Sequence, residues 1–319
     1  MISLTTRLYK GETDLQAISE LLNACEAVDQ LDQGVSVSEL RQISDDPSLD
    51  KMRDIRLWED ANGKLIGIGH LWIPTSGKVI NGFLSCHVAP RARNENLERH
   101  IITWGKERMR EVKQERGLNA TLCASAHDQN ANFIAPLESS GFKSDRYVLT
   151  MRRTLKESIP EPQLPTSFTL RQVKTGQDAK AWVEMYNQSF IDHPNHRDLE
   201  VEHYKNHWSN HTYRPDLDLV AIAPDGTFAA FCECKINLEN NTHTGRNQGW
   251  ILKLGTRRGF RRIGLGRAML LSGMRQLQAA GMDIIKLSVD LNNPNGALQL
   301  YESVGFHKLY TMISYIKDI

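Results

Sequence analysis

Residues 257–270 read RRGFRRIGLGRAML, a short turn that carries five arginines and three glycines in a chain of 319 residues with a formal net charge of only +1. A strand-like apolar segment precedes the turn at 249–256, and a helical pattern follows it at 265–281. The first N–H groups of a helix lack backbone partners, and the helix dipole adds partial positive charge there. We therefore predict that the turn binds an anion, and that a pyrophosphate is the natural ligand.

The glycines and arginines of the turn serve this site in different ways. Gly264 and Gly266 let the backbone approach an anion without interference from a Cβ atom. Arg261, Arg262 and Arg267 add full charges around it. The turn contains neither the G-K-[ST] of a Walker loop nor the G-x-G-x-x-G of a dinucleotide turn. A solvated basic turn before a surface helix is the alternative interpretation.

The chain repeats itself at an offset of 164 residues. The matched pairs, in order, are Arg7/Arg171, Lys10/Lys174, Asp14/Asp178, Ala17/Ala181, Asn23/Asn187, Gly117/Gly281, Gly141/Gly305 and Phe142/Phe306. Such ordered matches indicate a duplicated unit. A stretch with three prolines and few apolar residues lies between the copies. We therefore predict domains at 1–152 and 167–319, joined by a linker at 153–166.

Each copy has the pattern of an α/β (α+β) unit. In the second copy the expected strands are 168–173, 219–224, 228–237, 249–256, 284–290 and 307–317, and the expected helices are 179–190, 265–281 and 296–304. Some strands follow one another directly, whereas others are joined through a helix. The pattern therefore predicts a mostly antiparallel mixed sheet flanked by helices in each copy.

Composition excludes several classes of protein. The chain is 40% hydrophobic and 24% charged, as in a soluble globular protein. No stretch approaches the ~18 apolar residues of a membrane span, and no basic region followed by an apolar one marks a secretory signal. The near-neutral charge argues against a nucleic-acid partner. The scattered cysteines predict buried reduced thiols and a cytoplasmic protein; they are Cys25, Cys86, Cys123, Cys232 and Cys234. We expect a monomer or a homodimer.

Two motifs in the second copy resemble those of a known family. Arg261-x-x-Gly264-x-Gly266 after a strand resembles the acyl-coenzyme A pyrophosphate motif of GNAT-type N-acetyltransferases. The tail VDLNNPNGALQLYESVGF at 289–306 is similar to the closing motif of that family, whose recurring residues are here Asn293, Ala297, Tyr301, Gly305 and Phe306. The tandem arrangement at this length further resembles the mycothiol synthase-like members of the family.

This resemblance implies an acetyl-CoA-dependent enzyme that transfers the acetyl group to the amine of a small acceptor by direct attack. In the family, the strand before the turn supplies a backbone oxyanion donor, here near Leu254, and pairs with pantetheine, here through Leu254 and Thr256. Tyr301 resembles the general acid that protonates the departing thiolate, and Asn293 lies near the pantetheine. The residues of the phosphate site are then Arg261, Arg262, Gly264, Leu265, Gly266 and Arg267. A packed aromatic for Tyr301 and a turn residue for Asn293 are the alternatives.

The general base is less clear from the sequence. Many family members place a Glu at the position that Trp250 occupies here. Glu233, in the apolar strand FCECK, and His193, in the loop FIDHPNH, are substitutes, because a carboxylate in an apolar strand needs a partner or a wet cavity. The solvent side of a strand for Glu233, an ordering role for His193, and a water chain as base remain open. We expect His193 to contact the acceptor.

Three histidines recur with helical spacing at His203, His207 and His211. Two histidines four residues apart can bind zinc, but H-E-x-x-H is absent and no acidic third ligand is near. We therefore predict a solvated or pocket-lining helix face and no metal.

The first copy has lost the chemistry of the second. Asn96 and Glu98 stand where the second copy has Gly264 and Gly266, and Leu137 replaces the tyrosine. A carboxylate at this place would repel pyrophosphate. We therefore predict a degenerate, non-catalytic partner domain that shapes the acceptor pocket, and one cofactor per chain. Two rival functions are an acyl-CoA-binding sensor without turnover and a protein or peptide N-acetyltransferase.

Overall fold

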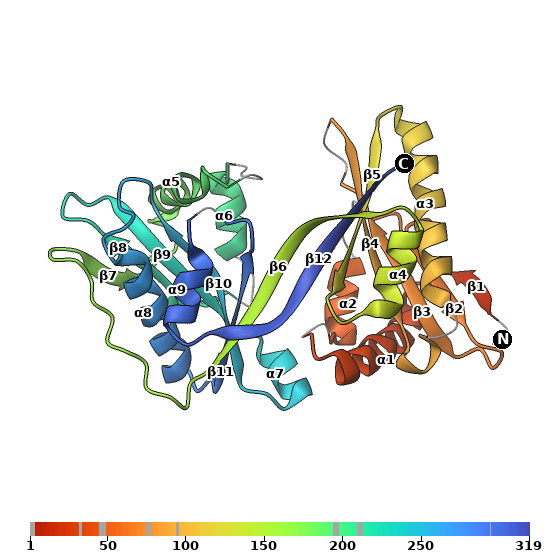
Figure 1. Cartoon of the computed structure of the whole chain (residues 1–319), viewed down its shortest axis with the longest axis horizontal. Helices are drawn as coiled ribbons and strands as arrows, with labels where there is room; N and C mark the ends of the chain where they lie inside the picture. Colours follow the sequence, from red (N-terminus) through yellow and green to blue (C-terminus); the bar gives the residue numbers. More distant parts are fainter. Residues whose placement is uncertain are drawn as a thin grey trace. The chain divides into compact units, whose positions relative to one another are not determined.

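The computed structural model describes residues 4–31, 34–44, 49–74, 78–93, 96–193, 198–208, 213–293 and 295–319 (Figure 1). The chain forms two compact units. The first comprises residues 1–147 and 311–319, and the second comprises residues 148–310. Among the described residues, no helix combines the length and the apolarity needed to cross a bilayer.

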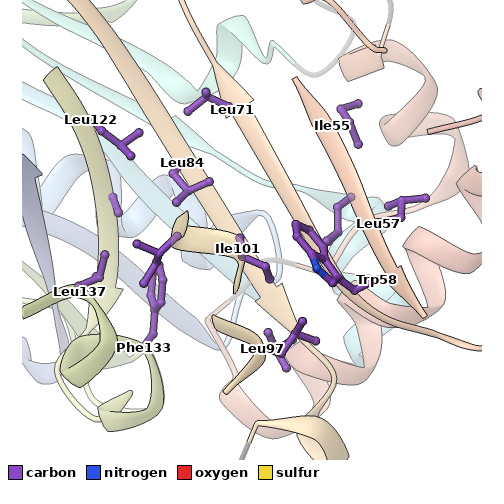
Figure 2. Packing of buried hydrophobic residues seen from close by; sticks show 14 of the residues in the cluster. Ile55, Leu57, Trp58, Leu71, Leu84, Leu97, Ile101, Leu122, Phe133 and Leu137 are labelled. Carbon is purple, nitrogen blue, oxygen red and sulfur yellow. The ribbon is translucent and has the colours of Figure 1, made fainter. Parts of the chain in front are cut away.

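The first unit is built on a sheet in the order β1-β2-β3-β4-β5-β12, in which only β4 and β5 run parallel. Its strands are β1 (Thr5–Leu8), β2 (Ile55–Glu59), β3 (Leu65–Trp72), β4 (Ile80–Val88), β5 (Ala120–His127) and β12 (His307–Asp318), which belongs to this unit from residue 311 on. Its helices are α1 (Glu12–Asp29), α2 (Val37–Ser44), the short η1 (Pro90–Ala92), α3 (Leu97–Arg116) and α4 (Ala131–Ser139). Figure 2 shows apolar side chains of the sheet, such as Leu84 and Leu122, gathered with Leu97 and Ile101 of α3.

The second unit repeats this plan with the order β6-β11-β10-β9-β8-β7, in which only β10 and β11 run parallel. Its strands are β6 (Lys143–Thr154), which belongs to this unit from residue 148 on, β7 (Thr169–Gln172), β8 (Asp218–Ile222), β9 (Phe228–Lys235), β10 (Gln248–Thr256) and β11 (Ile284–Asp290). Its helices are α5 (Ala179–Phe190), α6 (Val201–Trp208), the short η2 (Pro215–Leu217), α7 (Leu238–Thr244), α8 (Leu265–Ala279) and α9 (Ala297–Ser303). The prediction of a mostly antiparallel mixed sheet flanked by helices is confirmed, whereas α7 was not predicted.

Each unit takes one strand from the other half of the sequence. Strand β6 follows α4 along the chain, but its segment Val148–Thr154 pairs with β11. Strand β12 follows α9, but its segment Met312–Asp318 pairs with β5. The compact units are therefore not continuous in sequence. The division at 1–152, 153–166 and 167–319 describes the repeat, and its interpretation as domains stays a prediction.

The repeated residues hold equivalent turns in both units. Arg7 donates to the two carboxylate oxygens of Asp14 at 2.9 and 2.8 Å, and the Lys10 N–H donates to the same carboxylate at 2.7 Å. The residues 164 positions later repeat these contacts at 2.6, 3.0 and 2.7 Å. Asn23 accepts from the Val35 N–H at 3.0 Å and donates to its carbonyl at 3.1 Å, and its counterpart does the same at 2.8 and 3.1 Å. These matches support a duplication.

The two faces of the second sheet carry different helices. Cys232 and Cys234 of β9 belong to a buried cluster with α8 and α9, including Tyr301. Phe231, which directly precedes Cys232, belongs to a separate cluster with Trp182 of α5 and the aromatic residues of α6. Because side chains alternate along a strand, residue 233 shares the face of Phe231. We call these the α8 face and the α5–α6 face.

Candidate active site

Strand β10 loses one of its two neighbours halfway along its length. It pairs in parallel with β11 only from Gln248 to Ile251. A register shift at Leu252 follows in its ladder with β9, and residues 253–256 then pair with β9 alone among the described strands. Backbone N–H and C=O groups on the open edge need partners. Leu254 and Thr256 both lie in this segment, so the amides of a pantetheine chain have a free strand edge to pair with there.

The turn after β10 presents a row of backbone N–H groups. Arg262 and Gly264 both have positive φ, at 64° and 87°, and Gly264 precedes the first turn of α8. Among the described residues, none accepts a hydrogen bond from the N–H groups of residues 262–267. Left-handed residues beside helical ones form concave anion-binding nests. The predicted site at Gly264, Leu265 and Gly266 therefore fits a pyrophosphate.

Gly266 stands where three elements meet. A Cβ atom at this position would lie 3.3 Å from Oγ1 of Thr256 and 3.9 Å from Cδ2 of Leu300 in α9. The end of β10, the start of α8 and helix α9 therefore converge beside the turn. Arg267 connects two of these elements, α8 and α9, because its Nη1 donates to Oγ of Ser303 in α9 at 2.7 Å.

Arg261 is held by protein groups. Its Nε donates to the Thr256 carbonyl at 3.2 Å and its Nη2 to the Ser189 carbonyl at 2.9 Å. Its Nη1 donates to Asp192 at 2.7 Å and to Oδ1 of Asn295 at 3.2 Å. The guanidinium thus joins the end of α5, the turn and the loop before α9. Of the predicted phosphate ligands, Arg262 is the exposed arginine for which the described residues offer no partner.

The first unit keeps this arginine without the glycines. Arg93 donates from Nε to the Val88 carbonyl at 3.2 Å, and its two terminal nitrogens donate to Asp29 at 2.7 and 2.6 Å. Asn96 takes the place of Gly264 with a φ of 61°, so the left-handed turn survives. The first unit has lost the glycines of the phosphate site, but it keeps the arginine and its contacts. These contacts therefore indicate that the arginine braces the turn.

We expect Arg261→Gln to lower the free energy of unfolding by about 1–3 kcal/mol, since it leaves two carbonyls without their charged donor and Asp192 with Arg258 as its remaining arginine partner. Urea denaturation would measure this change, and Arg93→Gln should behave alike. Arg262→Gln, the matched control in the same turn, should leave the free energy of unfolding unchanged and lower the affinity for acetyl-CoA instead. An Arg261→Gln protein of normal stability with strongly reduced acetyl-CoA affinity would contradict the brace.

Tyr301 lies in α9 on the α8 face and is only 8% exposed. Burial raises the pKa of its phenol to about 12, with a smaller contribution from Cys232. Its hydroxyl has no hydrogen-bond partner among the described residues. The Phe306 N–H donates to the Tyr301 carbonyl at 3.1 Å, as the Phe142 N–H donates to Leu137 in the first unit. The two positions are therefore equivalent, and only the second carries a hydroxyl.

Glu233 lies on the other face of the sheet from Tyr301 and is 2% exposed. Its Oε1 lies 2.7 Å from Nε2 of His207 in α6, and its Oε2 accepts from Nζ of Lys253 in β10 at 2.9 Å. Burial opposes the charge of Glu233, but the hydrogen bonds from His207 and Lys253 and their charges outweigh it, so its pKa lies below the usual value. The structure therefore does not bring Glu233 and Tyr301 into contact, and it gives Glu233 two partners.

A second buried carboxylate adjoins Glu233 and was not predicted as a site residue. Asp218 of β8 is opposite Glu233 in the ladder and is 0% exposed. One of its oxygens accepts from the hydroxyls of Tyr204 and Tyr213, each at 2.9 Å. Burial, followed by the charge of Glu233, raises the pKa of Asp218 to about 7. Its signal in the sequence is a charged residue at the head of the apolar stretch DLVAI.

The other predicted residues are dispersed around these elements. His193 is partly buried, and its backbone N–H donates to the Phe190 carbonyl at 2.8 Å where α5 ends. Asn293 accepts from the Asn295 N–H at 2.9 Å, which shapes the turn before α9. Trp250 occupies the position at which many family members have a Glu, and Nζ of Lys286 lies 5.9 Å from the centre of its ring.

The histidine stripe is divided by the structure. The side chain of His203 is 70% exposed beside Glu200, whereas His207 turns inward to Glu233. His211 lies outside the described residues. The five thiols are free, as predicted, but only those of Cys25, Cys232 and Cys234 are buried, whereas Cys86 and Cys123 are half-buried.

Comparisons with known proteins agree with this geometry. The sequence model of the acetyltransferase (GNAT) family matches residues 179–306, which include the turn and Tyr301. A mycothiol acetyltransferase of Thermomonospora curvata is 28% identical over 306 residues, covering 96% of this chain and 95% of that protein. A GCN5-related N-acetyltransferase from Sphaerobacter thermophilus shares the fold with a TM-score of 0.79 at 22% identity, covering 99% and 95% of the two chains.

The tandem arrangement also has a counterpart among solved structures. A tandem GNAT protein from the clavulanic acid biosynthesis pathway has a TM-score of 0.74 at 11% identity, covering 100% of this chain and 98% of that one. The duplication, the motifs of the second copy and the similarity to curated enzymes over nearly the whole chain lead to one family. The second copy matches the GNAT family of acetyltransferases, and the whole chain resembles the mycothiol acetyltransferases and has the fold of tandem GNAT proteins.

Proposed function

We propose that this chain transfers the acetyl group of acetyl-CoA to the amine of a small molecule by direct attack, and that the second unit carries the reaction. The observation that carries the proposal is the free edge of β10 at Leu254 and Thr256, which leads directly into the N–H nest at Gly264 and Gly266. A pantetheine chain and a pyrophosphate need these two features in this order. The curated relatives, which are mycothiol acetyltransferases, support a small acceptor.

The residues of the second unit divide the reaction between them. The backbone N–H near Leu254 donates to the carbonyl oxygen as negative charge develops there. The turn from Arg261 to Arg267 holds the pyrophosphate, chiefly through backbone N–H groups. Tyr301 donates to the departing thiolate, since its buried hydroxyl stays protonated and unpartnered among the described side chains. Glu233 belongs to the group of residues that receives the proton of the amine.

We propose that segment 1–152 is a degenerate copy without catalysis, joined by the linker 153–166 to the catalytic copy at 167–319. Asn96, Glu98 and Leu137 support this division, because they replace the glycines and the hydroxyl of the second copy. The near-neutral charge supports an acceptor other than nucleic acid, and the free thiols support a cytoplasmic protein.

A single assay tests the reaction. The protein is mixed with acetyl-CoA and a panel of small amines, and a thiol reagent reports free coenzyme A. Release that depends on a small amine supports the proposal. Binding of acetyl-CoA without release with any amine or peptide would indicate a sensor, and release with peptides alone would indicate a protein N-acetyltransferase.

We expect one acetyl-CoA to bind per chain. Glu98 is 4% exposed in the first turn of α3, and burial raises its pKa to about 7. At pH 8 the carboxylate is therefore charged and repels a pyrophosphate from the first unit. Isothermal titration calorimetry at pH 8 should give a stoichiometry of one. Two sites of comparable affinity would show that the first unit still binds the cofactor.

A further inference from the structure

The proton acceptor of the reaction can be sought among the buried polar groups of the α5–α6 face. Lys253 belongs to the open segment of β10 and directly precedes Leu254, near which the carbonyl oxygen is expected. Its ammonium donates to Glu233, and Glu233 in turn contacts His207 at 2.7 Å. These three side chains therefore connect α6 to the place where the acetyl group would lie.

Two of the three groups are poor proton acceptors. Both oxygens of Glu233 are engaged, its side chain is 3% exposed, and its partners hold its pKa below the usual value. The Lys253 ammonium donates to this carboxylate and its Nζ lies 5.8 Å from the centre of the Trp182 ring, so an anion and an aromatic ring already engage it. Neither side chain is arranged to take a proton.

His207 differs from both in having a nitrogen to spare. A carboxylate accepts hydrogen bonds and cannot donate them, so the short contact with Glu233 requires a proton on Nε2 of the imidazole. In neutral imidazole Nδ1 then carries the lone pair. The described residues offer Nδ1 no hydrogen-bond partner, and the side chain is 31% exposed. An imidazole backed by a carboxylate is the usual arrangement of a general base.

We infer that His207 takes the proton from the attacking amine through Nδ1, and that Glu233 is its positioning residue. This inference rests on the proposed function. The amine nitrogen forms the bond to the carbonyl carbon, its proton passes to Nδ1, the C–S bond breaks, and the thiolate receives its proton through Tyr301. Charged and titratable groups face His207 from the neighbouring strands and from its own helix. From the strands and the segment before β8 these are Glu233 of β9, Lys253 of β10, Asp218 of β8 and Tyr213. From α6 and the residue before it they are Tyr204, His203 and Glu200.

The kinetic test compares two histidines one turn apart on α6. His207→Gln should lower kcat/KM by about 10²–10³ without changing acetyl-CoA affinity, since the loss of a general base falls within this range. His203→Gln, the exposed control on the same helix, should leave both unchanged. Addition of imidazole to His207→Ala should restore part of the rate. Full activity of His207→Gln would overturn the inference.

The pH profile separates His207 from Glu233 as the base. An imidazole base must be neutral to accept the proton, so kcat/KM should decrease as the pH is lowered. Glu233→Gln keeps an acceptor for Nε2 but removes the negative charge that favours proton uptake by the imidazole, so the plateau rate should fall while the acidic limb persists. If Glu233 were itself the base, Glu233→Gln would abolish the acidic limb and the activity together, and His207→Gln would retain both.

A measurement without an acceptor distinguishes failure of this inference from failure of the proposed function. Nitrogen NMR of histidine-labelled protein, assigned with His207→Gln, should show a proton on Nε2 and none on Nδ1 at high pH. The reverse tautomer in an enzyme that turns over small amines would overturn the role of His207 alone. The expected tautomer in a protein that releases no coenzyme A with any amine would instead refute the proposed function, and the catalytic role of His207 with it.

Discussion

Replacing Tyr301 by phenylalanine should lower turnover by ~10²–10⁴, the range expected for the loss of a general acid, while acetyl-CoA affinity stays nearly unchanged. The hydroxyl is the only group removed, and the ring keeps its packing against Phe306, whose centre is 6.2 Å away. The hydroxyl interacts most strongly when the leaving thiolate develops charge, so the change affects kcat more than binding. Steady-state kinetics and calorimetry with acetyl-CoA measure the two quantities.

The acidity of the phenol sets the size of this effect. Burial raises the pKa of Tyr301 to about 12, whereas a thiol has a pKa of about 8.5. Complete proton transfer to the thiolate is therefore uphill, and the hydroxyl acts largely as a hydrogen-bond donor, so we expect a loss near 10². The rate should show no alkaline decline from Tyr301 until the pH approaches about 12.

A second acyl donor separates this role from simple packing. A donor with a more acidic thiol needs the hydroxyl less, so Tyr301→Phe should lose less activity with that donor than with acetyl-CoA. A packing tyrosine would change the thermal stability modestly and would show no dependence on the donor. Equal activity of the variant with acetyl-CoA would remove Tyr301 from the mechanism and would favour a sensor.

Gly266→Glu, which copies Glu98 of the first unit, should abolish acetyl-CoA binding and leave the fold intact. Two like charges about 4 Å apart repel by roughly 4 kcal/mol at an effective dielectric constant of ~20. This energy corresponds to a loss of affinity of nearly a thousandfold. The thermal unfolding midpoint should change little, because Gly266 is half-buried in the first turn of α8 and its added Cβ atom would meet chiefly the Thr256 hydroxyl, at 3.3 Å. Calorimetry and a thermal melt test both parts of the prediction.

Two controls separate charge from bulk and from backbone conformation. Gly266→Gln adds the same bulk beside Thr256 without the charge, so it should retain much more affinity than Gly266→Glu. Gly264→Asn copies Asn96, which keeps a φ of 61° in the first unit, and should change affinity by no more than ~10-fold because asparagine tolerates this conformation. Unchanged affinity of Gly266→Glu would mean that the pyrophosphate binds elsewhere.

The elements of this protein could be predicted from local patterns. Helix α5 and strand β11 have the predicted bounds, and Gly281 ends the helical pattern with a φ of 84°. These features depend on side-chain periodicity and on the few residues that tolerate a left-handed backbone. The turn at 257–270 was recognisable for the same reason, since an anion-binding nest is made by neighbouring residues.

The contacts of the candidate base could not be predicted in this way. Glu233 was singled out as a charged residue in an apolar strand, but its partners His207 and Lys253 lie 26 and 20 residues away in sequence. These two residues contact Glu233 because of the register between β8, β9 and β10 and because α6 packs on the same face of β9. The same holds for Arg261, which was predicted as a phosphate ligand and makes its contacts with Asp192, Asn295 and backbone carbonyls.

The sequence by itself determined the duplication, the order of strands and helices, and the turn that fits a pyrophosphate. Each of these properties is encoded by residues close together or by an exact spacing. Only the tertiary structure decided that β6 joins β11 and β12 joins β5, because strands of similar pattern can pair with any open edge. It also decided that Tyr301 and Glu233 lie on opposite faces of one sheet. Alternation along a strand shows which of its side chains share a face, but it does not show which helices cover that face.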